Sequence, residues 1–166
     1  MHADYKIRVA GPNDAPALTR LLRAAFSEVA RQFGLTASNA PKHVSNCEES
    51  WIREALDKGV SYFVLEAGEE CLGCVALERA NSEVCYLERL AVHPEYQGKG
   101  LGVALVRHAL EEARRQGALR VEIGIVAAHT RLHDWYAKRG FVDTGRKSFH
   151  HLPFEVGFMA CTVSVS

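Results

Sequence analysis

The spacing of apolar residues along the chain predicts alternating strands and helices. Lys6–Ala10 is typical of a short strand, and the turn Gly11–Asp14 supplies an N-cap for a long helix. This predicted helix carries its apolar residues on one stripe, made of Leu18, Leu21, Leu22, Ala25, Phe26 and Val29. The segment Gly34–His43 is rich in small and polar residues and indicates a loop, and a second helix follows from about Ser45 to Lys58.

Three strand-like segments come next, separated by short turns: Ser61–Ala67, Cys71–Arg79 and Glu83–Val92. Turns this short favour an antiparallel meander. A helix then extends from Gly100 to about Gln116. Because a helix connects the two strands, Arg120–Val126 must lie parallel to the strand that precedes the helix.

The last part of the chain predicts a short helix, Thr130–Arg139, and two strands, Val142–His151 and Phe154–Val163. No internal repeat, low-complexity tract or linker interrupts the pattern. The sequence therefore predicts a single mixed α/β domain over residues 1–166. Phe154–Val163, if it lies at an edge of the sheet, could pair with a second copy in a homodimer.

The charge balance excludes several classes of partner. Twenty basic residues balance twenty acidic ones, so no overall positive field exists to hold a nucleic acid or an anionic membrane. No run of apolar residues is long enough to span a bilayer, and the first residues lack the pattern of a signal peptide. We therefore expect a cytoplasmic protein without nucleic-acid or membrane partners.

The five cysteines indicate reduced core thiols. Cys71 and Cys74 form a C-x-x-C sequence, but the alternation along Cys71–Leu77 is typical of a strand. No second Cys or His pair stands at the spacing of a zinc site. We expect no metal.

Three glycines stand between a predicted strand and a predicted helix, in the turn Gln97-Gly98-Lys99-Gly100-Leu101-Gly102. A glycine-rich turn at a helix N-terminus directs several backbone N–H groups at one anion, and the helix dipole adds partial positive charge. A diphosphate fits this arrangement. The alternative is that the glycines only shape a tight turn.

The glycine spacing argues against nucleotide-binding and redox domains. A Walker loop requires Ser or Thr after its lysine, whereas Gly100 follows Lys99. A dinucleotide-binding fingerprint that starts at Gly98 would need a third glycine where the chain has Val103.

The residues from Leu90 to Gly102 resemble the central motif of the GNAT superfamily of N-acetyltransferases. In that motif Arg or Gln, two residues, Gly, one residue and then Gly or Ala bind the pyrophosphate of coenzyme A. A second family motif resembles Trp135–Phe141, in which Tyr136 precedes Gly140 and Phe141. The order of predicted elements matches the family over nearly the whole chain. The resemblance implies a single-domain fold with a mixed, mostly antiparallel sheet of about seven strands, a splayed central parallel pair and flanking helices.

The resemblance implies an acetyl-CoA-dependent N-acetyltransferase. Its pyrophosphate site would consist of Gln97, Gly98, Lys99, Gly100, Leu101 and Gly102. Between the splayed strands, backbone groups of Leu90, Ala91 and Val92 would pair with the pantetheine arm, and an N–H of Leu90 or Ala91 could polarise the thioester carbonyl. Because no Ser–His or Cys–His motif is present, we expect direct attack by the amine without a covalent enzyme intermediate.

Two residues are candidates for proton transfer. Alternation along the strand places Tyr86, Glu88, Leu90 and Val92 on one face, where a carboxylate is unusual, so Glu88 is the candidate base. The equal alternative is that Glu88 pairs with an arginine or binds the cation of the acceptor. Tyr136 corresponds to the family tyrosine near the coenzyme sulfur, a candidate to protonate the departing thiolate.

His129 stands seven residues before this tyrosine, where the family commonly has an Asn that ties the helix start to the coenzyme. His129 could replace that Asn as a donor. The acceptor remains open between a small-molecule amine and a protein amine. The alternative function is a non-catalytic module that senses acyl-CoA and tolerates the loss of Glu88 and Tyr136.

Overall fold

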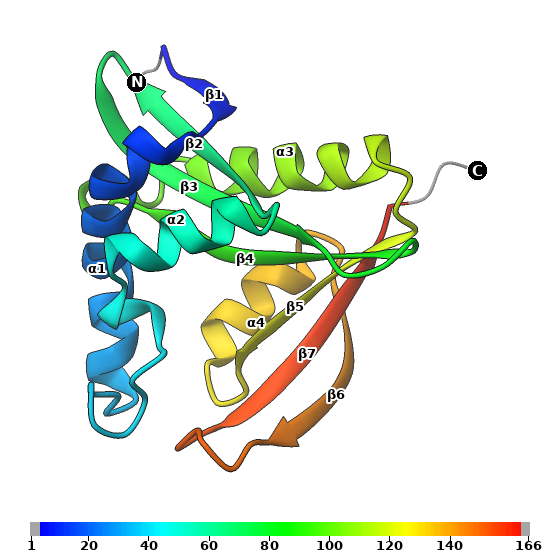
Figure 1. Cartoon of the computed structure of the whole chain (residues 1–166). Helices are drawn as coiled ribbons and strands as arrows, with labels where there is room; N and C mark the ends of the chain where they lie inside the picture. The colour runs from blue at the N-terminus through cyan, green and yellow to red at the C-terminus, as the bar shows by residue number, and fades with distance from the viewer. Residues whose placement is uncertain (1–3, 164–166) are drawn as a thin grey trace.

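The computed structural model describes residues 4–163 and contains one seven-stranded sheet with helices on both faces (Figure 1). The strands are β1 (Lys6–Val9), β2 (Ser61–Ala67), β3 (Glu70–Arg79), β4 (Val84–Val92), β5 (Arg120–Val126), β6 (Val142–Ser148) and β7 (Glu155–Thr162). The helices are α1 (Ala15–Gln32), α2 (Glu49–Asp57), α3 (Leu101–Arg115) and α4 (Thr130–Ala137). Single 3-10 turns occur at η1 (Pro12–Asp14), η2 (Val44–Asn46) and η3 (Pro94–Tyr96). The predicted second helix therefore begins later than expected, because its first residues form η2 instead.

The spatial order of the strands is β1-β2-β3-β4-β5-β7-β6, and only β4 and β5 are parallel. This arrangement confirms the mixed, mostly antiparallel sheet. Strand β7 lies between β5 and β6, so the expectation that Phe154–Val163 could be an edge strand is wrong. The edge on that side is β6, whose residues are all exposed.

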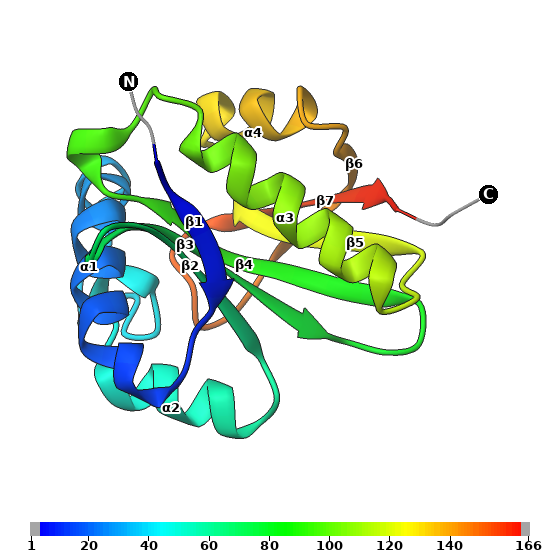
Figure 2. The same ribbon diagram turned by 90° about the horizontal axis from the view of Figure 1, so that it is seen from above.

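The sheet separates two apolar cores. Helix α3 packs against one face, and α1 and α2 cover the other, as the view from above shows (Figure 2). The apolar stripe of α1 buries Leu18, Leu21 and Leu22, and the stripe of α3 buries Leu105 and Val106. Helix α3 approaches the sheet closely at Gly73, where a Cβ atom would lie 2.9 Å from both the Ala91 oxygen and the Leu105 side chain.

The central parallel pair opens after only three residue pairs. Val84, Cys85 and Tyr86 of β4 oppose Arg120, Val121 and Glu122 of β5, and no further pairing connects the two strands within residues 4–163. Both strands continue beyond this point, because β4 remains paired with β3 and β5 remains paired with β7. The sheet therefore splays at its centre.

Strand β4 contains a β-bulge in its splayed half. Pairing with β3 shifts register between Cys74 and Ala76, so that Arg89 and Leu90 together oppose the single residue Val75. Arg89 has a φ of 53°, which lies in the left-handed region that non-glycine residues rarely adopt. The extra residue bends the strand and changes which side chains point to each face.

The bulge overturns the alternation that we expected along this strand. Leu90 and Val92 pack against the core under α3. Glu88 stands opposite Ala76, which belongs to the core under α1 and α2. Tyr86 and Glu88 therefore share a face, whereas Leu90 and Val92 lie on the opposite one.

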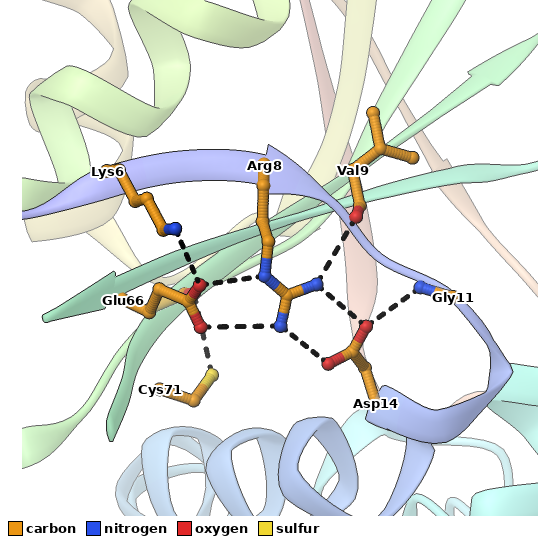
Figure 3. A network of polar contacts seen from close by, with 8 residues as sticks. Lys6, Arg8, Val9, Gly11, Asp14, Glu66 and Cys71 are labelled. Carbon is orange, nitrogen blue, oxygen red and sulfur yellow. Dashed lines mark hydrogen bonds and ion pairs between the residues drawn. The ribbon is translucent and has the colours of Figure 1, made fainter. Parts of the chain in front are cut away.

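An ion-pair network attaches the first strand to the rest of the molecule (Figure 3). The Arg8 guanidinium donates to Glu66 of β2 at 2.8 and 3.3 Å and to Asp14 of η1 at 2.8 and 3.0 Å. Asp14 also accepts from the Gly11 N–H at 2.8 Å, so the carboxylate does not cap α1 itself. The network joins β1, β2 and the turn that leads into α1.

Candidate active site

The glycine turn leaves a row of backbone donors open at the start of α3. Gly98 and Gly100 have φ values of 79° and 83°, which only glycine adopts without strain. No side chain caps the helix, and among the described residues no acceptor binds the N–H groups of residues 98–103. A Cβ at Gly98 or Gly100 would meet no atom within 4 Å, so the space beside the turn is open. Free donors at a helix N-terminus fit an anion such as a diphosphate.

The other residues of the turn orient it against the fold. The Gln97 side chain donates to the Val92 carbonyl at 3.1 Å and so ties the turn to the end of β4. Leu101 is buried in the core, and a Cβ at Gly102 would lie 3.2 Å from Trp135 of α4. Lys99 is exposed and its ammonium lies 5.9 Å from the centroid of the Tyr96 ring.

The glycine turn follows the end of β4 that has separated from β5. Leu90, Ala91 and Val92 belong to the part of β4 that has no partner in β5. Their backbone groups on that side are not used in the parallel ladder, and backbone groups in such a position need partners when a ligand excludes water. The glycine turn thus follows directly on the unpaired part of β4.

Tyr136 is buried on the α3 side of the sheet, with 5% of its surface exposed. Its ring meets Trp135 and Phe141 edge to face at 5.1 and 5.3 Å. Burial raises the pKa of the phenol, which therefore stays protonated at neutral pH. Within residues 4–163 its hydroxyl has no hydrogen-bond partner, and a buried hydroxyl without a partner is costly unless a ligand supplies one.

His129 caps the N-terminus of α4. Its Nδ1 accepts from the Leu132 N–H at 3.4 Å, so the neutral ring carries its proton on Nε2. Partial burial lowers the pKa of the imidazole and keeps it neutral, and its ring lies 5.5 Å from that of Phe33. The remaining Nε2–H is the donor that His129 could offer to a ligand.

Glu88 is half-buried and shares its face of the sheet with a second carboxyl group. Burial raises the pKa of Glu88 to about 7, and a hydrogen bond and repulsion from Glu78 on β3 add to the shift, whereas Arg89 opposes it. Glu88 and Glu78 lie on neighbouring strands, because Ala76 opposes Glu88 and Glu78 opposes Tyr86. A carboxyl group with a pKa near neutrality can both take up and release a proton.

Tyr136 and Glu88 therefore lie on opposite faces of the sheet, with the splayed part of β4 between them. Nothing in the sequence pattern indicates that the side chains of Glu78 and Arg89 lie on the same face of the sheet as Glu88. Glu78 could be found only from the strand register, and Arg89 only from the position of the bulge.

A groove of about 590 Å³ runs along α3 from its first turn. Its lining includes Val103, Val106, Arg107, Leu110, Glu111 and Arg114 of α3, and Lys138, Arg139, Thr162 and Val163 from the other side. Arg114 pairs with Glu111, whereas Arg107, Lys138 and Arg139 form no ion pair within the described part of the chain. The Arg139 guanidinium lies 5.0 Å from the centroid of the Trp135 ring.

Residues 4–163 hold no group of three or more His, Cys, Asp or Glu side chains arranged to bind a metal ion. All five cysteines are free, and burial raises the pKa of the Cys71 thiol to about 11. Within the same residues no helix has the length and apolar character required to cross a bilayer.

Known proteins are similar to this chain in sequence and in architecture. The model of the acetyltransferase (GNAT) family matches residues 26–141. An uncharacterised N-acetyltransferase of Escherichia coli, YjgM, is 25% identical over 147 residues, which are 87% of this chain and 81% of that protein. This chain spans only 20% to 57% of the length of several other curated N-acetyltransferases that it matches.

Solved structures match almost the entire chain. The ribosomal-protein-S18-alanine N-acetyltransferase of E. coli superposes with a TM-score of 0.78 at 18% identity, covering 98% of this chain and 96% of that one. The putative acetyltransferase yncA of Salmonella typhimurium, solved with its cofactor acetyl-CoA, superposes with a TM-score of 0.72 at 21% identity, covering 99% and 96%. Together with the family match over more than half of the chain, these findings show that the protein belongs to the GNAT family of N-acetyltransferases.

Proposed function

We propose that this acetyltransferase transfers an acetyl group from acetyl-CoA to a primary amine by direct attack of the amine on the thioester. The observation that carries the proposal is the run of open N–H groups at residues 98–103, directly above the gap between β4 and β5. These donors fit the diphosphate of the coenzyme. The Salmonella neighbour was solved with acetyl-CoA, which supports the same ligand for this chain.

In the proposed complex, the diphosphate contacts the turn from Gln97 to Gly102 and the pantetheine arm pairs with the backbone of Leu90, Ala91 and Val92. The thioester then lies in the gap. An N–H of the bulged strand, from Leu90 or Ala91, donates to the thioester oxygen as negative charge develops there. The Nε2–H of His129 is available as a further donor from the start of α4.

The amine approaches from the α1 and α2 side, where Glu88 is located. Glu88 takes one proton from the amine, directly or through a water molecule, and the neutral nitrogen attacks the thioester carbon. The C–N bond forms, the C–S bond breaks, and the nitrogen releases its second proton to solvent, which leaves the neutral amide. Tyr136 gives its proton to the departing thiolate from the opposite face, which accounts for a buried hydroxyl that has no partner in residues 4–163.

The first test is to measure binding of acetyl-CoA by calorimetry and release of the coenzyme A thiol with a panel of amines. We expect binding and turnover. A protein that does not bind acetyl-CoA would contradict the proposal. Binding without transfer to any amine would instead indicate a sensor module.

Replacing Tyr136 with phenylalanine tests its role as the acid. We expect kcat to fall by about 10- to 100-fold, because general acid catalysis contributes at least that much, while the dissociation constant of acetyl-CoA changes little. Phe141→Leu is the matched control, since it alters a neighbouring ring that has no role in proton transfer. Equal kcat values for Tyr136→Phe and the wild type would assign Tyr136 to packing alone.

A further inference from the structure

The bulge at Arg89 brings two consecutive charged side chains to the same face of the sheet. In a regular strand, Glu88 and Arg89 would point to opposite faces. Instead, the Arg89 guanidinium donates to the Tyr62 hydroxyl at 2.8 Å, and Tyr62, Ala76 and Glu88 form one cross-strand row. Ala76, between the two larger side chains of the row, is fully buried.

Arg89 is half-buried without a carboxylate to balance it. It forms no ion pair within residues 4–163, and Tyr62 satisfies only one of its five N–H donors. Its φ of 53° adds backbone strain to the cost of burial. A strained and partly desolvated arginine with free donors is well suited to a planar anion, because its fork matches a carboxylate in two parallel hydrogen bonds.

Other cationic side chains lie near Arg89. Lys42 and Arg89 each lie 5.8 Å from the centroid of the Trp51 ring on α2. Arg23 of α1 is also near, since both it and Arg89 lower the pKa of the buried Cys47 thiol against the larger raising effect of burial. Arg89 follows Glu88 along β4, whereas Glu78 lies on the other side of the row, opposite Tyr86.

We propose that the acceptor is a free amino acid, whose carboxylate binds to Arg89 while its amino group faces Glu88. The proposal rests on the proposed function, and it names the acceptor of that same reaction. A zwitterion matches a site that presents a guanidinium and a carboxyl group from adjacent residues. A neutral amine or a peptide N-terminus leaves Arg89 without its partner.

The experiment compares initial rates for L-amino acids, their amides and the corresponding amines without a carboxyl group, all with saturating acetyl-CoA. We expect kcat/KM for the preferred amino acid to exceed that of its amide by about 30-fold, as expected for a charge-assisted, bidentate hydrogen bond. The difference should appear mainly in KM, since Arg89 binds the acceptor away from the reacting atoms.

Arg89→Gly is the decisive variant, because glycine adopts a positive φ without strain and preserves the bulge. We expect it to abolish the preference for the acid over the amide, while the dissociation constant of acetyl-CoA stays close to that of the wild type. Arg89→Lys should restore part of the preference. Arg53→Met, which changes an exposed arginine paired with Glu49 on α2, is the control.

Equal rates for acids and amides, or acetylation confined to peptides and proteins, would overturn this inference and leave the proposed acetyl transfer intact. An unchanged preference in Arg89→Gly would also overturn it. Failure to bind acetyl-CoA at all would overturn both proposals together.

Discussion

At the scale of single residues, the chemistry of the site depends on which side chains the strands place together. Glu88 alone on an apolar strand would be a buried acid with a pKa raised by desolvation. Its neighbour Glu78, ten positions earlier in the chain, adds repulsion and a hydrogen bond that favours the protonated form. The pair therefore takes up and releases a proton near neutral pH, as a catalytic base must.

Removing Glu78 should shift the pH dependence of the reaction. In Glu78→Gln the neighbouring negative charge is lost, so the pKa of Glu88 falls below about 7 and the base is ionised at lower pH. We expect the ratio of kcat/KM between Glu78→Gln and wild type to rise as the pH falls below about 7 and to be constant above about pH 8. Using the ratio cancels the titration of the amine itself.

Two variants complete this measurement. Glu69→Gln, in the exposed turn between β2 and β3, should give a ratio that does not vary with pH. Glu88→Gln should lower kcat by about 100-fold above about pH 8 if the carboxylate is the base, and by less at lower pH, where Glu88 is itself protonated. A ratio for Glu78→Gln that is flat from pH 5.5 to 8 would show that Glu78 does not control the proton on Glu88.

At the scale of elements, helix α3 joins the glycine turn to the groove beside α4. Coenzyme A carries a 3′-phosphate in addition to its diphosphate, and Arg107, Lys138 and Arg139 provide unpaired cations along this groove. The stacking of Arg139 on Trp135 holds its guanidinium near the first turn of α3, since Trp135 contacts Gly102. We expect these basic side chains to bind the 3′-phosphate.

The role of the groove can be tested with dephospho-coenzyme A, which lacks the 3′-phosphate. Arg139→Met should raise the dissociation constant of coenzyme A by about tenfold, because it removes a charge-assisted hydrogen bond. The dissociation constant of dephospho-coenzyme A should hardly change. Arg115→Met, which removes an arginine paired with Glu112 on α3, is the control. Equal losses for the two ligands would place the 3′-phosphate elsewhere.

The same elements show what the sequence could predict and what it could not. Periodicity and turn residues located every strand and all four long helices, with ends that differ by a few residues, because these signals are local. The glycines of the turn Gln97–Gly102 were found for the same reason. The bulge at Arg89 was not predicted from the sequence, because its positive φ comes from the packing of β3 and β4 and no glycine marks the position. The faces of Leu90 and Val92 were misassigned as a direct result.

At the scale of the whole molecule, the network around Arg8 attaches the edge strand β1 to the sheet and to α1 (Figure 3). Arg8 holds the pKa of Asp14 below its usual range, through its hydrogen bonds first, and does the same for Glu66. A carboxyl group with a lowered pKa in the folded state contributes stability above its unfolded pKa, which is about 4, and the contribution is lost as the pH falls through the folded value.

Arg8→Met should therefore destabilise the protein in a pH-dependent way. We expect a loss of about 1–2 kcal/mol in the free energy of unfolding at pH 7, since Arg8 is partly exposed and its bonds are screened by solvent. The loss should shrink below about pH 4 as Asp14 and Glu66 become protonated. Urea denaturation across this range measures it. Arg31→Met, in the exposed pair with Glu28, should change the free energy of unfolding far less than Arg8→Met.

The opening between β4 and β5 also has a closed end, where Tyr86 meets Glu122 across the last parallel pair. A thioester that enters from the glycine turn advances toward this vertex, so the space ahead of the carbonyl narrows with every added methylene. A gap that narrows in this way limits the length of the acyl chain that can bind. In the proposed complex we therefore expect acetyl to fit ahead of the vertex, whereas a longer fatty chain would have to separate hydrogen-bonded strands.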